Sequence, residues 1–274
     1  MPLHPDWIVP DWPAPPNVRA VCTTRAGGVS NPPFGSLNLG DHVGDDPAAV
    51  AANRQTLRDA LGARPVFLQQ VHGVDVITLN AATPDGVVAD ACLSTTTGVA
   101  CTMMVADCLP VLITNRHGSA VAAAHAGWRG LAGKHGVGGQ GVLEAVLTSF
   151  WQHPSVKWTD VAIENKVKET LVWLGPCIGS KAFEVGSEVR EAFCAFDPWA
   201  DECFAPQAGG KYLANLPALA RRRLAALGVT AIYGSDGSPD WCTFSNAARF
   251  HSHRRDSVAL GGSGRLAASV WMTP

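Results

Sequence analysis

The sequence predicts one mixed domain of α-helices and β-strands. Short apolar stretches with the character of strands alternate with amphipathic helical stretches, and glycine or proline separates most of them. The 274 residues are 47% hydrophobic and only 16% charged, which is typical of a compact globular protein with a sizeable core. Because no internal repeat or low-complexity linker divides the chain, we expect these elements to share one domain.

The first half of the chain is predicted to contain strands around one clear helix. Residues 18–24 form an apolar strand, and a loop rich in glycine and proline follows. Residues 45–62 form the helix, with an aspartate cap, a proline in its first turn and a glycine at its end. Residues 66–79 alternate in the manner of strands, with a break at His72-Gly73. Further strands are expected at residues 89–94, 98–105, 111–115 and 119–124.

The second half of the chain alternates helices and strands. A glycine-rich stretch leads into a helix near residues 139–151, and residues 182–193 indicate a turn followed by a helix. Residues 211–228 carry leucines at helical spacing before a final glycine, which predicts an amphipathic helix with a glycine stop. Strands are expected at residues 171–176, 230–235 and 264–272.

The charge and the apolar pattern argue against several classes of protein. The net charge is −2 without a basic stripe, so no nucleic-acid partner is expected, and the one basic cluster, Arg221–Arg223, is expected on a solvated helix face. Residues 1–17 lack the basic and apolar regions of a signal peptide, and no stretch is apolar enough for a transmembrane helix, so no membrane partner is expected. The eight cysteines are therefore predicted to be free thiols in the cytoplasm.

Three loop segments carry side chains that bind metals. His72, Cys108 and His125 each lie at the break or the end of an apolar strand, and adjacent strands could bring them to one sheet edge. Two imidazoles and one thiolate suit a zinc ion with an open fourth position, the pattern of catalytic sites. The separations of 36 and 17 residues match no compact zinc-finger spacing, and hydrogen-bonded core residues are the competing interpretation.

A second interpretation uses the same atoms for covalent catalysis. Cys108 could be a thiolate nucleophile, with His125 or His72 as its base and Asp107 as the group that orients the base. Asp107 directly precedes Cys108, so on a strand its side chain would point to the opposite side. This placement weakens a simple triad and leaves the metal and nucleophile interpretations to be separated by chelation.

Arginines on glycine-rich loops form a third group of candidates. Arg25, Arg129 and the pair Arg254-Arg255 could bind phosphate or another oxyanion, because a guanidinium donates two parallel hydrogen bonds. Surface solvation or ion pairs are the alternative for each of them. A wall for a flat ring could come from three aromatic residues that could equally pack in the core: Phe34, Trp128 and Phe250.

His251 and His253 form an H-x-H pair, which suggests copper. An ordinary multicopper site of the laccase type needs several such pairs, and this sequence contains one. Copper is therefore the less favoured metal.

Six long motifs together closely resemble the YfiH family, also called the laccase-domain or polyphenol-oxidase-like family. The resemblance extends from about residue 18 to the end of the chain. The motifs occur in this order: TTRAGGVSNPPFGSLNLGDHVGDD, QQVHGVDV, ADCLPVLI, AAAHAGWRGLAG, WLGPCIGSKAFEVG and FHSHRRD with GRLAASVWM.

The resemblance implies a single α+β catalytic domain over residues 18–274, with mixed β-sheets flanked by helices, after an N-terminal segment of residues 1–17. It implies one zinc ion on His72, Cys108 and His125. The implied activities act on purine nucleosides and phosphate: phosphorolysis of adenosine, inosine and methylthioadenosine, and deamination of adenosine. Polyphenol oxidation by copper and Cys108-dependent hydrolysis have also been attached to the family and are the alternatives.

The resemblance also suggests which residues contact the substrates. Zinc would hold a phosphate oxygen or a water in its open position, with phosphate bound by Arg25, Arg129 and Arg254 and further polar contacts from Gln70 and Asn38. The run after the RRD motif is longer than the family's usual run, and His253 stands where a tyrosine is usual, so the resemblance does not define the wall of the site there. A partner-binding module with a structural zinc, closed by Cys177 or His251, is the non-enzymatic alternative.

Overall fold

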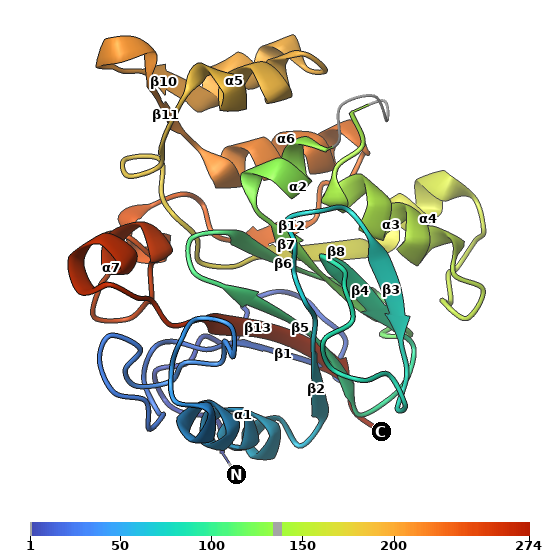
Figure 1. Cartoon of the computed structure of the whole chain (residues 1–274). Helices are drawn as coiled ribbons and strands as arrows, with labels where there is room; N and C mark the ends of the chain where they lie inside the picture. Colours follow the sequence, from blue (N-terminus) through green and yellow to red (C-terminus); the bar gives the residue numbers. More distant parts are fainter. Residues whose placement is uncertain (1, 134–138) are drawn as a thin grey trace.

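Two β-sheets packed face to face form the centre of the structure, a computed structural model that describes residues 2–133 and 139–274. Helices cover the outer face of each sheet, so the molecule has four main layers (Figure 1). Apolar residues from both sheets, including Met103, Leu112, Ala123 and Val270, form the core between them. The predicted single α+β domain with mixed sheets and flanking helices is confirmed.

The first sheet has four strands in the order β1-β13-β5-β2. Its strands β13 and β5 are antiparallel neighbours, whereas β2 and β5 are parallel, so the sheet is mixed. Residues from its outer face pack against the first helix through Leu57, Phe67 and Trp271. The bounds are β1 (Val18–Cys22), β2 (Arg64–Phe67), β5 (Val99–Val105) and β13 (Leu266–Met272).

The second sheet has six strands in the order β12-β8-β6-β7-β4-β3. Its outer pairs, β12 with β8 and β3 with β4, are parallel, and the central pairs are antiparallel. The bounds are β3 (Val76–Leu79), β4 (Ala91–Ser94), β6 (Leu109–Asn115), β7 (Val121–Ala126), β8 (Thr170–Leu174) and β12 (Ile232–Gly234).

Strand β7 lies in the middle of the molecule and is buried along its whole length. Its alternate residues face two different cores: Ala122 and Ala124 contact the helical side, whereas Val121 and Ala123 contact the other sheet. Small side chains at these positions let sheet and helices approach closely on both faces. The strand therefore holds His125, its next-to-last residue, on a rigid support.

Helix α1 (Pro47–Leu61) covers the four-stranded sheet, and its ends are those that the sequence predicts. The Asp46 side chain accepts a hydrogen bond from the Ala48 N–H, and Gly62 adopts a left-handed conformation with φ 60°. The helices that cover the six-stranded sheet are α2 (Trp128–Ala132), α3 (Val142–Gln152), α4 (Ile163–Glu169) and α6 (Leu216–Ala226) (Figure 1).

A small third sheet, in the order β10-β11-β9, lies with helix α5 beyond the helical layer (Figure 1). Helix α7 lies at the side of the molecule, where its first turn contacts the turn between β5 and β6. These elements are β9 (Glu184–Val185), α5 (Ser187–Cys194), η1 (Pro198–Cys203), β10 (Phe204–Pro206), η2 (Ala208–Gly210), β11 (Tyr212–Ala214), η3 (Pro239–Trp241) and α7 (His253–Leu260).

The helix predicted over residues 211–228 is shorter than expected. Strand β11 occupies its first residues, where Leu213 pairs with both neighbouring strands, and α6 begins only after Asn215. The Asn215 side chain accepts a hydrogen bond from the Ala218 N–H, which is the ordinary role of a helix N-cap. Leu213 fits the helical apolar spacing by coincidence, so periodicity alone placed the boundary wrongly.

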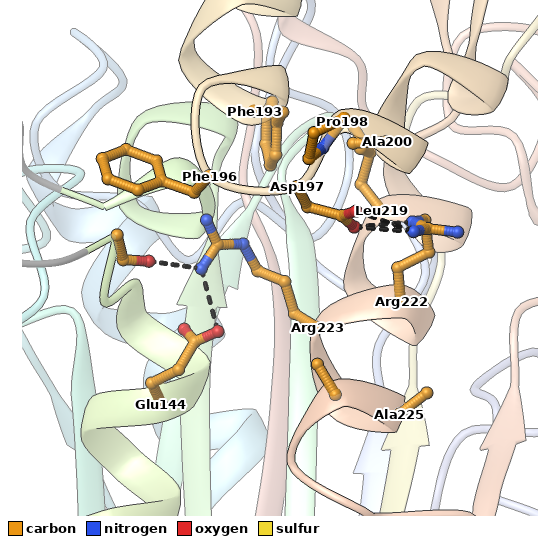
Figure 2. A pocket seen from close by; sticks show the side chains of 12 residues that line it. Glu144, Phe193, Phe196, Asp197, Pro198, Ala200, Leu219, Arg222, Arg223 and Ala225 are labelled. Atoms are coloured by element: carbon orange, nitrogen blue, oxygen red, sulfur yellow. Dashed lines mark hydrogen bonds and ion pairs between the residues drawn. The ribbon is translucent and has the colours of Figure 1, made fainter.

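The cluster Arg221–Arg223 does not lie on a solvated helix face, and that prediction is wrong. Arg222 makes two hydrogen bonds to Asp197, and Arg223 bonds Glu144 and the Gly139 carbonyl (Figure 2). Arg223 also donates to the Ala132 carbonyl. These contacts join α6 to α3, to the end of α2 and to the segment after α5. They also form the wall of a cavity of about 560 Å³, and its described lining residues include no histidine or cysteine.

Residues 2–17 pack against the four-stranded sheet. Ile8 forms a β-bridge with Cys22, and Trp7 is buried. Among the residues that the structure describes, no helix is both long and apolar enough to cross a membrane.

Candidate metal centre and substrate cavity

His72, Cys108 and His125 converge at one end of the two sheets. One ligand atom from each lies within 4.8 Å of the others, and the Cys108 Sγ lies 3.7 Å from His72 Nε2. The two imidazole rings meet edge to face, with their centroids 4.8 Å apart. The structure thus brings together three side chains that are far apart in the sequence, and these could hold one metal ion.

Three different elements position these ligands. His125 belongs to β7 and pairs in register with Pro110 of β6, so the start of β6 lies beside it. Cys108 directly precedes β6, after a turn in which Asp107 has a φ of 87°. His72 lies in the loop after β2, with a φ of 60°. Positive φ values are costly for residues other than glycine and are frequent at functional sites.

Asp90 is a site residue that the sequence did not single out. Its carboxylate is fully buried and accepts four hydrogen bonds. Oδ1 accepts the His125 Nδ1–H at 2.8 Å and the His72 N–H at 2.9 Å, whereas Oδ2 accepts the N–H groups of Val71 and Gly73. Because Nδ1 of His125 carries the proton, its Nε2 is free to bind a metal.

The charges of the site are strongly coupled. Burial would raise the pKa of the Cys108 thiol, but the neighbouring His125 and His72 imidazoles outweigh burial and lower it to about 6. Burial would likewise lower the pKa of His125, but the Cys108 thiolate and the Asp90 carboxylate raise it to about 9. The neighbouring imidazoles thus favour the thiolate form of Cys108, which is the form of cysteine that binds metals.

The donor set fits one zinc-like ion with an open position. Two nitrogen ligands and one sulfur ligand come from rigid supports, and a buried carboxylate orients one imidazole, as is usual around bound zinc. Cys177 and His251, the expected closing ligands, do not belong to this group: Cys177 Sγ donates to the Ile178 carbonyl, and His251 Nε2 contacts the Leu37 carbonyl. Within the described residues, a closed structural site is therefore not formed by these two side chains.

The glycines of the AHAGWRG segment make room for the ligands. A Cβ atom at Gly127 would lie 2.7 Å from the His72 ring and 3.0 Å from Cys108 Sγ. A Cβ atom at Gly130 would lie 2.6 Å from the carbonyl oxygen of Gly73. The turn after β7 therefore passes so close to the other two ligands that only glycine fits without displacing them.

Gly127→Ala is expected to lower metal affinity about tenfold, because the new methyl group displaces His72 and Cys108 while the φ of −68° suits alanine. Metal competition with a chromophoric chelator measures the effect. Gly261→Ala is the control: its φ is 77° and nothing lies within 4 Å, so stability should fall by about 1 kcal/mol with metal affinity unchanged. Equal metal affinity in both variants would contradict this close packing.

A cavity of about 570 Å³ opens over the three ligands. Of the predicted substrate residues, Gln70, Arg129 and Arg254 line it, and so does Trp128. Arg129 is exposed and its guanidinium lies 4.4 Å from the Trp128 ring centre. Both polar atoms of the Gln70 amide are bonded to the main chain of Met104, so Gln70 fixes the loop that carries His72.

Four other predicted residues do not line this cavity. Arg25 donates to the carbonyls of Gly35 and Ala247. Asn38 is buried, and its Oδ1 accepts the Arg265 N–H at 2.9 Å. Phe250 is fully buried, and Phe34 packs beside Gly262. None of these four residues is therefore placed to contact a ligand in the cavity.

Arg265 is the second cavity residue that the sequence did not single out. Its guanidinium donates to the carbonyls of Ser263 and Gly264 and forms no ion pair within the described part of the chain. Burial lowers the pKa of Arg265, and the charges of Cys108 and Asp107 oppose that shift. A part-buried arginine without an acidic partner is costly unless an anionic ligand pairs with it.

Asp107 and the H-x-H pair have roles other than those considered from the sequence. Asp107 does not orient a histidine: it accepts hydrogen bonds from the Thr243 hydroxyl and the Arg254 N–H, which anchors α7 over the cavity. His251 is buried away from the cavity, whereas His253 lines it. The two histidines therefore point to different surroundings and form no metal-binding group among the described residues.

Comparisons with known proteins identify the family of the chain. A family model described as multi-copper polyphenol oxidoreductase laccase matches residues 19–273. A protein of Pseudomonas aeruginosa named purine nucleoside phosphorylase is 51% identical over 268 residues, covering 97% of this chain and 98% of its own. The Escherichia coli protein named purine nucleoside phosphorylase YfiH is 48% identical, with the same coverage.

Solved structures show the same fold. A Neisseria meningitidis protein superimposes with a TM-score of 0.83 at 42% sequence identity and covers 98% of this chain and 100% of its own. A Bacillus licheniformis protein called YfiH superimposes with a TM-score of 0.80 at 26% identity, covering 93% of both chains.

Proposed function

The chain belongs to the laccase-like family that includes the YfiH proteins, and from this premise we propose that it is a zinc-dependent purine nucleoside phosphorylase. The observation that carries the proposal is a three-ligand metal site at the base of a cavity lined with arginines. Relatives at 51% and 48% identity bear the same enzyme name, which supports the reaction class. The proposed substrates are adenosine, inosine and methylthioadenosine, each with phosphate.

His72, Cys108 and His125 would hold the zinc ion. When bound, zinc supplies Lewis-acid stabilisation of negative charge on an oxygen in the cavity. The chain itself contributes the Asp90 carboxylate, which keeps the proton on Nδ1 of His125. The ligand set is thereby oriented before substrate enters.

Arg129, Arg254 and Arg265 are proposed to bind phosphate. All three line the cavity, and none forms an ion pair within the described residues, so their charges are available to a dianion. Asp107 carries the opposing charge, but both its oxygens accept hydrogen bonds from the protein. Asn38 is proposed to position Arg265, because its Oδ1 accepts the Arg265 N–H. Arg25 is proposed to hold the neighbouring loop in place by donating to the Gly35 carbonyl.

In the proposed reaction a phosphate oxygen forms a bond to the anomeric carbon of the ribose. The glycosidic C–N bond breaks, and the base leaves with the electron pair and takes up a proton. The products are the free base and ribose 1-phosphate, or methylthioribose 1-phosphate from methylthioadenosine. Positioning and charge stabilisation suffice for such a step.

We propose deamination of adenosine as a second reaction of the same site. Water adds at carbon 6 of the purine, ammonia leaves, and inosine forms. The same cavity would serve both reactions because each needs one oxygen nucleophile beside the metal ligands. The free thiols of all eight cysteines support a reducing compartment, and we propose the cytoplasm.

Two other functions use the same residues. A Cys108-dependent hydrolase is favoured by the low pKa of the thiol, about 6. A copper-dependent polyphenol oxidase is suggested by the family's name, but the described residues contain a single group of metal-binding side chains, and multicopper sites need several.

Metal analysis of the purified protein, followed by incubation with adenosine and phosphate, tests the proposal. We expect one zinc per chain, with adenine and ribose 1-phosphate forming only when phosphate is present. Inosine formation without phosphate reports deamination. Activity of a metal-free protein that alkylation of Cys108 abolishes would support the hydrolase instead, and oxidation of catechols after copper loading would support the oxidase.

Arg129→Ala is expected to raise the KM for phosphate about tenfold while changing adenosine deamination much less, because one charge-assisted contact to phosphate is lost. The Arg129 side chain makes no hydrogen bond within the described residues, so the fold should be unaffected. Arg249→Ala is the matched control, since Arg249 also lies over an aromatic ring, 5.3 Å from the Phe250 centre, but outside the cavity. If both reactions fell equally in Arg129→Ala, the phosphate role would be wrong.

A further inference from the structure

A second chamber adjoins the metal cavity. It has a volume of about 390 Å³ and shares His42, Gln70 and Met104 with the cavity over the metal ligands. Its other walls come from the loop before α1, from α1 itself, from the end of β2 and from the loop between β3 and β4. A ligand that reaches past the three shared residues would therefore contact both spaces.

The two spaces differ in electrostatic character. The metal cavity is lined by three arginines and one aspartate, whereas the chamber is lined by Asp41, Asp85 and a single arginine, Arg54. Arg54 already pairs with Asp41 at 3.2 Å. Burial together with the charge of Arg265 lowers the pKa of His42, so that imidazole stays neutral at pH 7. Asp85 lies 4.0 Å from the Arg64 guanidinium, so both carboxylates have arginine partners. The chamber therefore has no excess positive charge to bind phosphate and suits the uncharged half of a nucleoside.

Most polar groups of the chamber are already fixed by the protein. Arg54 donates to the Leu39 carbonyl at 2.9 Å and lies 4.1 Å from the Phe67 ring centre. Asp85 accepts the Phe67 N–H, and the Gln70 amide is bonded to Met104. These bonds make the chamber rigid and leave few groups free to select a ligand.

Gln69 is the exception among the described lining residues. Its main chain is held on both sides, since its N–H donates to the Val87 carbonyl and its own carbonyl accepts the Ala89 N–H. Its side chain is exposed and makes no hydrogen bond within the described structure. Residues alternate along an extended chain, so Gln69 lies on the same face as Phe67, the face that Arg54 covers. A side-chain amide that has no partner and is carried by a fixed main chain is suited to hydrogen-bonding a ligand selectively.

The chemistry of an amide matches the edge of a purine. Adenine presents a donor at its 6-amino group beside an acceptor nitrogen, and hypoxanthine presents an acceptor at its 6-oxo group beside the N1–H donor. A glutamine carries one donor and one acceptor group of nearly equal shape and can pair with either edge by turning its amide over. One residue can therefore accept both 6-amino and 6-oxo purines.

We propose that this chamber binds the purine base, with Gln69 contacting the 6-position edge, while the metal cavity binds phosphate. The proposal rests on the proposed phosphorylase function. It accounts for the acceptance of both adenosine and inosine by one site, which neither the metal ligands nor the arginines explain.

Gln69→Leu tests the proposal in the zinc-loaded protein. The KM values for adenosine and inosine should each rise about tenfold, while the KM for phosphate stays within twofold of that of the unsubstituted protein. Purine riboside, which has only hydrogen at carbon 6, should show a smaller change, because it lacks the group that Gln69 contacts. Gln207→Leu is the matched control: that glutamine is exposed and its side chain donates to the Pro206 carbonyl, away from both cavities, so no KM should change.

Three results would overturn the base-binding role: unchanged nucleoside KM values in Gln69→Leu, an equal rise for purine riboside, or an equal rise in the KM for phosphate. Each leaves the phosphorylase function standing. If the unsubstituted protein showed no phosphorolysis, the proposed function would fail instead. The chamber could then still be tested by calorimetric titration with adenine and hypoxanthine. Gln69→Leu should bind these bases about tenfold more weakly than the unsubstituted protein. Equal affinity of the two proteins for the bases would overturn the base-binding role.

Discussion

Replacing His125 with alanine is expected to abolish stoichiometric zinc binding and both purine activities. The side chain is one of the three proposed ligands, and its removal also leaves the buried Asp90 carboxylate without its imidazole partner. Loss of an inner ligand should cost more than the 10- to 100-fold in affinity that outer partners of metal sites contribute. If zinc stabilises the transition state by several kcal/mol, kcat/KM should fall about a thousandfold or more. Metal content by mass spectrometry and product formation from adenosine and phosphate measure the two effects.

A buried histidine elsewhere provides the matched control. His251 is also fully buried, but its Nε2 contacts only a main-chain carbonyl and it lies outside the metal-binding group. His251→Ala should lower stability by a comparable amount because both variants create a cavity, yet it should keep one zinc per chain. Full phosphorolysis by a folded, metal-free His125→Ala protein would refute the metal mechanism.

Most of the fold could be predicted because its elements carry local signals. The strands read as apolar runs between turn residues, and α1 has both an aspartate cap and a glycine end. The boundary of α6 failed because Leu213 satisfies a helical spacing while the third sheet pairs it as a strand. Pairing partners such as Glu184 lie far away in the sequence, and a pattern of single residues contains no information about them.

The cluster of proposed metal ligands could be predicted for a similar reason, and its supporting residues could not. His72, Cys108 and His125 stand out because their side chains are unusual at the ends of apolar strands. Asp90 lies between two alanines directly before β4, and an acidic residue at this position is typical of the polar end of a strand. The usable signal was an aspartate enclosed by small apolar residues at the start of a wholly buried strand, since such an acid needs several hydrogen-bond donors.

The arginines divide in a way that composition could not reveal. Arg25 lies in a glycine-rich loop, which suggested an anion site, but its donors are used by main-chain carbonyls of the same loop and of residue 247. Arg265 stands in an ordinary position before the last strand, yet it lines the cavity without an ion pair in the described structure. Whether an arginine is available to a ligand depends on which partners already satisfy it, and this is decided by tertiary contacts.

Asp90→Asn should separate orientation of the ligands from their presence. Asn has the same shape as Asp, but one of its two terminal atoms is an NH₂ donor. Each carboxylate oxygen of Asp90 now accepts two N–H groups: Oδ1 those of His125 and His72, and Oδ2 those of Val71 and Gly73. In either orientation the new NH₂ group therefore faces two donors, so one pair of hydrogen bonds must be lost.

The expected result of Asp90→Asn is a 10- to 100-fold loss of zinc affinity with all three ligands still in the chain. Chelator competition measures the affinity, and the colour of the cobalt-substituted protein reports the ligand geometry, which a purely structural role would leave unchanged. Asp256→Asn is the control, because Asp256 is also buried and hydrogen-bonded but contacts Arg255 and Ser252 instead of a metal ligand. Both variants should lose stability, by about 3–5 kcal/mol if the buried partner is left unpaired, but only Asp90→Asn should alter the cobalt spectrum. Identical spectra in the two variants would mean that the strands alone orient His125 and His72, and that the carboxylate serves stability only.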